Sequence, residues 1–182
     1  MAALRSILDA AVQKLRSVSE SAKLDAELLL CHALELDHAG LALRLDDTAE
    51  VPASFNTLLN RRLNSEPVAY VLGEWEFYSM PLAIRPPTLV PRPETEHLVD
   101  AALELLPKSD ARILEIGTGS GCIAMAIAAH AKECSILATD IKPDNLALAS
   151  ENIERHHLEE RVTFTRGSLF EPFANHPQKF HL

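Results

Sequence analysis

Hydrophobic residues recur at helical spacing through the first third of the chain. Intervals of three and four residues predict amphipathic helices over residues 4–15 and 22–36. A third helix is predicted to begin near Pro52, because proline suits the first turn of a helix. The apolar sides of these helices would pack together as a small all-α domain over residues 1–70. The apolar positions of the first and third helices are Leu4, Ile7, Leu8, Ala11, Val12, Leu15, Phe55, Leu58, Leu59 and Leu63.

The helical period stops between Pro67 and Pro93, where prolines are frequent. Residues 74–78 alternate between acidic and aromatic side chains, and an apolar run at 82–84 follows a turn predicted at 79–81. This pattern is typical of two short antiparallel strands. We therefore expect a β-hairpin within a linker over residues 71–92.

Helical and strand patterns alternate from residue 93 to the end of the sequence. Short apolar strands are predicted at 112–116, 135–139 and 162–165, and helices at 94–106, 120–131 and 143–156. Such an order predicts a parallel sheet with helical crossovers, so residues 93–182 form the second predicted domain. In the helix at 94–106, one face carries Leu98, Ala101, Ala102, Leu105 and Leu106.

A glycine-rich turn joins the first of these strands to its helix, over residues 115–121. Its glycines permit a tight turn and the close approach of a ligand to the backbone. The spacing is GxGxG, whereas a dinucleotide site has GxGxxG, and the carboxylate of Glu115 would repel a pyrophosphate. A ligand with an amine or a sulfonium suits this turn better, as in S-adenosyl-L-methionine. The predicted contacts in the turn are Glu115, Gly117, Thr118, Gly119, Ser120 and Gly121.

Two further segments follow the next strands and extend the predicted cofactor site. Asp140 ends the second strand, where an acid accepts hydrogen bonds from both ribose hydroxyls of an adenosine ligand. A lone aspartate there would otherwise cap the helix that starts at Pro143. After the third strand, Ser168 is predicted to bond the adenine amine and Leu169 to cover the ring, with an ordinary loop as the alternative.

The composition narrows the classes of function. The net charge of −9 disfavours general binding to nucleic acid and suits a partner with basic residues. The cysteines at 31, 122 and 134 form no CxxC pair, so we expect neither a disulfide framework nor a zinc site. Three free thiols suggest that the protein resides in a reducing compartment. The pair His156-His157 lies at a predicted helix end and is interpreted as solvated. No apolar run suits a membrane helix and no signal peptide is recognised, so we expect a cytoplasmic protein.

Several segments resemble the peptide chain release factor glutamine N5-methyltransferases (PrmC/HemK family). They are LDAELLL at 24–30, PVAYVLG at 67–73 with EFY at 76–78, and LVPRPETE at 89–96, which is similar to the (I/V)PRPxTE segment of that family. The glycine turn with Asp140 resembles class I methyltransferases generally. The resemblance implies an α/β fold: a partial Rossmann-like class I methyltransferase sheet preceded by a small all-α domain and a β-hairpin linker.

The same resemblance implies a reaction. The family transfers a methyl group from S-adenosyl-L-methionine to the side-chain amide of the glutamine in the GGQ motif of peptide chain release factors, which act in translation termination. The helical domain is expected to help hold the release factor. Catalysis would depend on positioning, because the amide nitrogen is a poor nucleophile.

The sequence departs from the family pattern in two places. Family members often carry an acidic and then an aromatic residue near Ser168 and Leu169. They also continue into a fourth strand that ends in NPPY and binds the substrate amide, whereas residues 178–182 only reach the start of that strand. We therefore predict no catalytic residue and no turnover by these 182 residues alone. An open sheet edge would favour self-association.

Three alternatives remain on sequence grounds. An NAD(P)-dependent oxidoreductase is disfavoured by the GxGxG spacing and by Glu115. A methyltransferase acting on amino groups of nucleic acid is disfavoured by the acidic charge and by the lack of a basic patch. In a non-catalytic module, the helical domain would bind a release factor or another partner, and the remainder would serve as a scaffold.

Overall fold

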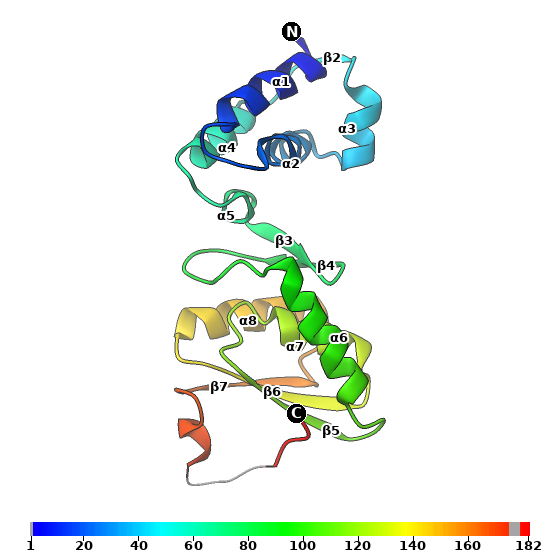
Figure 1. The fold of residues 1–182 in the computed structure, drawn as a ribbon, viewed down its shortest axis with the longest axis vertical. Coiled ribbons are helices and arrows are strands. Elements are labelled where there is room, and N and C mark those ends of the chain that lie inside the picture. The colour runs from blue at the N-terminus through cyan, green and yellow to red at the C-terminus, as the bar shows by residue number, and fades with distance from the viewer. Residues whose placement is uncertain (1, 175–178) are drawn as a thin grey trace. The chain divides into compact units, whose positions relative to one another are not determined.

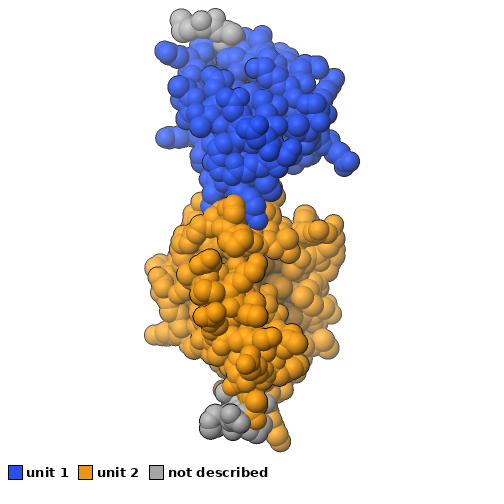
Figure 2. All heavy atoms as spheres, turned by 90° about the vertical axis from the view of Figure 1, so that its left-hand side faces the viewer, with its two compact units in different colours: residues 1–73 blue, residues 74–182 orange. Residues whose placement is uncertain are grey.

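The computed structural model describes residues 2–174 and 179–182, and it separates into two compact units (Figure 2). They comprise Met1–Gly73 and Glu74–Leu182. No helix in the described ranges is long and apolar enough to cross a membrane.

The first unit is helical. Its helices are α1 (Leu4–Leu15), α2 (Ala22–Leu34), α3 (His38–Arg44), α4 (Ala53–Leu63) and α5 (Val68–Leu72), and a short antiparallel pair joins β1 (Ala2–Ala3) to β2 (Thr48–Ala49) (Figure 1). The three helices predicted from periodicity are present. Their buried apolar side chains meet in one core, to which α1 contributes Leu4, Leu8, Ala11 and Leu15, α2 contributes Ala26, Leu29 and Leu30, and α4 contributes Phe55 and Leu59.

Two short helices were not predicted. Helix α3 begins at a cap, because the side chain of Asp37 accepts a hydrogen bond from the Gly40 amide at 2.6 Å. Helix α5 follows Pro67 and ends at Gly73, which takes a left-handed φ of 75°. The prediction that helical structure stops at Pro67 was therefore wrong. Both helices are too short to show an apolar period, and a cap fixes only one end of each, at Asp37 for α3 and at Gly73 for α5.

A salt bridge between α2 and α4 lies inside the helical unit. Arg62 Nε donates to Asp25 Oδ2 at 2.7 Å, and the two side chains are 13% and 4% exposed. Ser21 also donates a hydroxyl to Asp25. Because both charges are largely removed from water, each depends on the other for compensation.

We expect Asp25→Asn to destabilise the helical unit by about 2 kcal/mol, because it leaves the Arg62 charge buried and uncompensated. Native-state hydrogen exchange of amides in α2 and α4 measures this loss. The matched control is Asp46→Asn, which breaks the exposed pair with Arg5 and should leave exchange unchanged. Equal protection in the two variants would contradict the prediction.

The second unit opens with the expected hairpin, formed by β3 (Glu74–Phe77) and β4 (Met80–Ala83). The turn lies at Tyr78 and Ser79, which both have positive φ, as a two-residue hairpin turn requires. The turn predicted at 79–81 was therefore one residue late, and Met80 belongs to the second strand. Met80 pairs with Phe77, but this pairing was not predicted because methionine and proline are not residues that favour strands.

The remainder of this unit is an α/β layer structure. In chain order it contains a 3-10 turn at Pro93–Thr95, α6 (Glu96–Leu105), β5 (Ala111–Ile116), α7 (Cys122–His130), β6 (Cys134–Asp140), α8 (Pro143–Arg155), β7 (Val162–Arg166) and a 3-10 turn at Glu171–Phe173. The three strands are parallel in the order β5-β6-β7. Helices α6, α7 and α8 lie over one face of this sheet (Figure 1). The predicted α/β fold class is confirmed.

The edge of β5 is partly covered by the last residues of the chain. The His181 amide donates to the Arg112 carbonyl at 2.7 Å, and the Leu114 amide donates to the Leu182 carbonyl at 3.0 Å. Residue numbers increase in the same direction along both segments, so they begin to pair in parallel. This agrees with the start of a fourth strand, although Gln178, which was predicted to take part, lies outside the described residues.

Candidate functional site

The carboxyl ends of the three parallel strands meet at one edge of the sheet. The amides of Gly117 and Thr118 both donate to the Thr139 carbonyl, at 2.8 and 2.9 Å, and the Gly167 amide donates to the Asp140 carbonyl at 3.1 Å. These bonds fasten the glycine turn, the end of β6 and the loop after β7 to one another. Ligands of open α/β sheets bind outside this edge.

Asp140 stands at the centre of this edge and is 7% exposed. Its Oδ2 accepts hydrogen bonds from the Gly119 amide at 3.0 Å and from Asn145 Nδ2 at 3.1 Å, and its Oδ1 accepts from the Lys142 amide at 2.9 Å. Burial alone would raise the pKa of Asp140, but these donors outweigh it and hold the pKa below its usual value. Lys142 occupies the N-cap position of α8 and its side chain makes no capping hydrogen bond, so Asp140 is not the N-cap residue of this helix.

The glycine turn alternates between accessible and buried positions. Gly117 is exposed and Gly119 is half-buried, whereas Thr118, Ser120 and Gly121 are buried. A Cβ added to Gly117 would meet no atom within 4 Å, although φ is +80° there. A Cβ at Gly121 would lie 2.9 Å from the Cβ of Ala149 on α8. The first two glycines thus leave open backbone beside Asp140, and the buried residues shape the turn.

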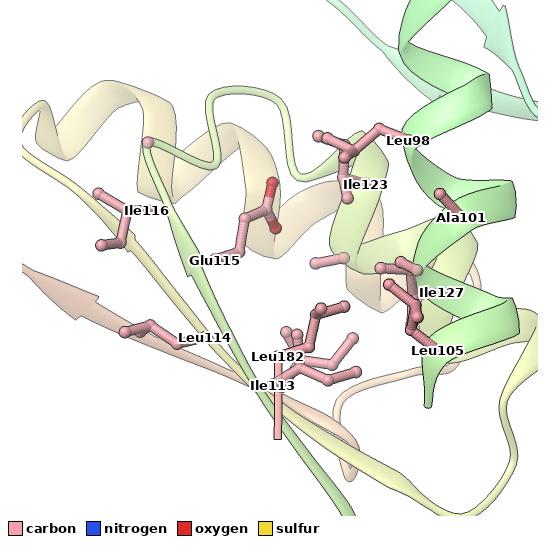
Figure 3. A pocket seen from close by; sticks show the side chains of 14 residues that line it. Leu98, Ala101, Leu105, Ile113, Leu114, Glu115, Ile116, Ile123, Ile127 and Leu182 are labelled. Atoms are coloured by element: carbon pink, nitrogen blue, oxygen red, sulfur yellow. The ribbon is translucent and has the colours of Figure 1, made fainter. Parts of the chain in front are cut away.

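The Glu115 side chain lies on the face of β5 that carries α6 and α7, whereas Leu114 and Ile116 lie on the opposite face (Figure 3). Its Oε2 accepts a hydrogen bond from the Thr118 hydroxyl at 2.9 Å. Burial raises the pKa of Glu115 to about 7, against the lowering effect of bonds from Thr118 and from the Ala124 amide in the first turn of α7. The carboxylate therefore organises the turn and titrates near neutral pH.

The loop after β7 carries two of the predicted residues at the surface. Ser168 is exposed and Leu169 is 64% exposed with a left-handed φ of 48°. Ile141, which follows Asp140 directly, is 59% exposed. Ile141 and Ser168 line one shallow hollow. Sequence reasoning missed Ile141, although an apolar residue directly after a strand-ending acid could have indicated it.

A separate apolar hollow lies between α6, α7 and the edge of β5 (Figure 3). Leu98 and Leu105 were predicted to share a face with Ala102, and they remain 56% and 73% exposed. The residues of α6 that enter the core are Val99 and Ala102. Glu115 is the charged residue at the end of this hollow nearest the glycine turn.

No group of three or more potential metal ligands occurs among the residues that the structure describes. The three cysteines are free and buried. Burial raises the pKa of Cys122 to about 12, so this thiol is protonated at neutral pH.

Comparison with known proteins adds two family matches. Residues 6–73 match the PrmC N-terminal domain, and residues 113–182 match a methyltransferase domain. The chain is 43% identical over 171 residues to a release factor glutamine methyltransferase of Nitratidesulfovibrio vulgaris, covering 92% of this chain and 58% of that protein. A protein of the same name from Vibrio cholerae is 41% identical over 175 residues, covering 94% of this chain and 61% of that one.

The Escherichia coli protein of this name is 42% identical over 138 residues, which cover 75% of this chain and half of that protein. The chain therefore spans about three fifths of the length of the first curated relatives that it matches. These matches confirm the resemblance drawn from the sequence motifs.

Proposed function

Because the chain is homologous to release factor glutamine methyltransferases over nearly all of its length, we propose that it binds S-adenosyl-L-methionine for methylation of the glutamine amide in peptide chain release factors. The observation that carries this proposal is the pairing of an open glycine turn with an ionised Asp140 at the carboxyl edge of a parallel sheet. When bound, the cofactor supplies a methyl group activated by its positive sulfur.

The residues of the site fit such a ligand. Asp140 would accept hydrogen bonds from the ribose hydroxyls, and Gly117 and Gly119 would let the ligand approach the backbone because no Cβ fills that space. Ile141 and Leu169 offer exposed apolar surface for the adenine ring, with Ser168 as a hydrogen-bonding partner. Thr118, Ser120 and Gly121 would act indirectly, by fixing the turn.

Glu115 would favour a cationic ligand when its carboxyl group is ionised. With a pKa of about 7, the ionised fraction of this group rises steeply through neutral pH. We expect the affinity for S-adenosylmethionine to increase about tenfold between about pH 6 and pH 7.5, and the affinity of Glu115→Gln to change little over that range. Calorimetric titration of both proteins measures the difference. A wild-type profile as flat as that of the variant would contradict this role of Glu115.

The same carboxyl group affects stability with the opposite sign. Its pKa in the folded protein lies above the ordinary value of 4.5, so the folded state holds the proton more tightly than the unfolded state does. In the absence of ligand, this contribution to stability is full below about pH 4.5 and is lost as the pH rises toward 7. The Glu115→Gln variant should lack this loss.

We propose that the helical unit contacts the release factor and that the protein is cytoplasmic. The match of residues 6–73 to the PrmC N-terminal domain supports a role specific to this family. The net charge of −9 suits a partner with basic residues. The exposed apolar side chains of Leu98 and Leu105, beside the partly covered edge of β5, support self-association, which sedimentation at increasing protein concentration measures.

Two assays test the proposed function. Calorimetry should detect binding of S-adenosylhomocysteine and no binding of NADH, which separates a methyltransferase from an oxidoreductase. Labelled S-adenosylmethionine with a release factor then tests for transfer to the glutamine. Release-factor binding without S-adenosylhomocysteine binding would overturn the cofactor assignment and favour the non-catalytic module.

A further inference from the structure

Asp140 is linked to a buried threonine in the loop that follows the hairpin. Thr88 is 1% exposed, and its hydroxyl donates to Asn145 Oδ1 at 2.7 Å. The amide of Asn145, itself 9% exposed, donates through Nδ2 to Asp140 Oδ2 at 3.1 Å. The same carboxylate oxygen receives the Gly119 amide of the glycine turn. Asp140 Oδ2 therefore accepts two hydrogen bonds, and Thr88 is connected to it through Asn145.

The direction of this chain of hydrogen bonds is determined by charge. An ionised carboxylate only accepts, so Asn145 must present its NH₂ group to Asp140 and its carbonyl oxygen to Thr88. Thr88 then serves as the donor that keeps the amide in this orientation. If the amide turned over, two oxygens would face each other at a buried position, which is strongly unfavourable.

The position of Thr88 is itself fixed. Its amide donates to the Arg85 carbonyl at 3.1 Å, and the preceding strand is fastened to α8 because Asn152 bonds both the amide and the carbonyl of Ala83. A Cβ built on Gly119 would lie 3.8 Å from the Thr88 methyl group. Thr88 therefore borders the glycine turn as well as the amide that reaches Asp140.

We propose that Thr88 and Asn145 are positioning residues that hold the Asp140 carboxylate in the orientation that receives the ribose hydroxyls of the cofactor. This inference rests on the proposed function and adds to it two residues that need not touch the ligand. It also gives a role to the segment between the hairpin and the LVPRPETE motif, which brings the Thr88 hydroxyl to Asn145.

The test uses Thr88→Val, which keeps the shape of the side chain and removes the donor. We expect Thr88→Val to weaken binding of S-adenosylhomocysteine about fivefold, because the hydrogen bond from the Thr88 hydroxyl to Asn145 Oδ1 is lost and the amide is no longer held in its orientation. The same variant should bind an S-adenosylhomocysteine analogue that lacks both ribose hydroxyls as tightly as the wild type does. Thr88→Ser retains the hydroxyl and should bind within about twofold of the wild type.

A second background separates positioning from a purely structural role. In an Asp140→Asn protein, Thr88→Val should have no additional effect on S-adenosylhomocysteine binding, because the group it acts through is already altered. The proposal would be overturned if Thr88→Val weakened binding of S-adenosylhomocysteine and of the analogue without ribose hydroxyls equally. It would also be overturned if the fivefold loss of S-adenosylhomocysteine affinity persisted in the Asp140→Asn background. If Thr88→Val fails to fold, Asn145→Ala is compared with the wild type in the same two titrations and judged by the same outcomes.

Failure of the inference and failure of the proposed function give different results. If the wild-type protein does not bind S-adenosylhomocysteine, the proposed function fails. If the wild type binds it and Thr88→Val binds it equally well, the cofactor site stands and the positioning role is wrong.

Discussion

Replacement of Asp140 by alanine is expected to weaken binding of S-adenosylhomocysteine by about 100-fold. The carboxylate is ionised and held by three donors, so it offers a fixed acceptor to two ribose hydroxyls. Each hydrogen bond to a charged acceptor contributes about 1.5–3 kcal/mol, so the loss of two corresponds to a factor of at least about 100. Calorimetric titration measures the two dissociation constants.

The matched control is Asp144→Ala, because Asp144 is an exposed acid in the first turn of the helix that follows Asp140. This variant should bind the ligand as the wild type does, which excludes a general effect of negative charge. Circular dichroism must show the same helix content in all three proteins. If Asp140→Ala keeps the wild-type affinity while folded, the ribose contact is elsewhere and the site is wrongly assigned.

The sheet and the position of the site were accessible from sequence because both depend on local patterns. Apolar runs bounded by glycine and proline located the three strands, and parallel order followed from their alternation with helices. Parallel strands end at one edge, so Asp140 and the glycine turn had to meet there. The 3.0 Å bond between the Gly119 amide and Asp140 joins residues 21 positions apart in the sequence.

The remaining features depend on tertiary contacts that leave no periodic signal. Thr88 and Asn145 are ordinary polar residues in the sequence, and their role appears only when the loop after the hairpin is packed against α8. The exposure of Leu98 and Leu105 could not be predicted either, because the apolar face of a helix does not show which of its residues pack on the sheet. Helices α3 and α5 were missed because they have only seven and five residues, too few to show an apolar period.

Two glycines of the same turn are expected to fail in different ways when replaced by alanine. Both have left-handed backbones, with φ of 80° at Gly117 and 78° at Gly121, so each substitution costs about 1 kcal/mol in backbone strain. Gly121→Ala also drives a methyl group to 2.9 Å from the Ala149 Cβ and 3.1 Å from its Cα. Because backbone of α8 must move, we expect a total loss of about 3 kcal/mol.

Gly117→Ala should lose only the strain energy, since its new methyl group meets no protein atom within 4 Å, but that methyl group would occupy space needed by the ligand. Urea unfolding therefore identifies Gly121→Ala as the unstable variant, and titration with S-adenosylhomocysteine identifies Gly117→Ala as a folded protein with affinity reduced at least about tenfold.

Adding Ala149→Gly to Gly121→Ala removes the methyl group that the new alanine contacts and should restore part of the stability, although glycine within α8 itself costs about 1 kcal/mol. Equal stability of the two single variants would show that contact with α8 is not what requires glycine at position 121.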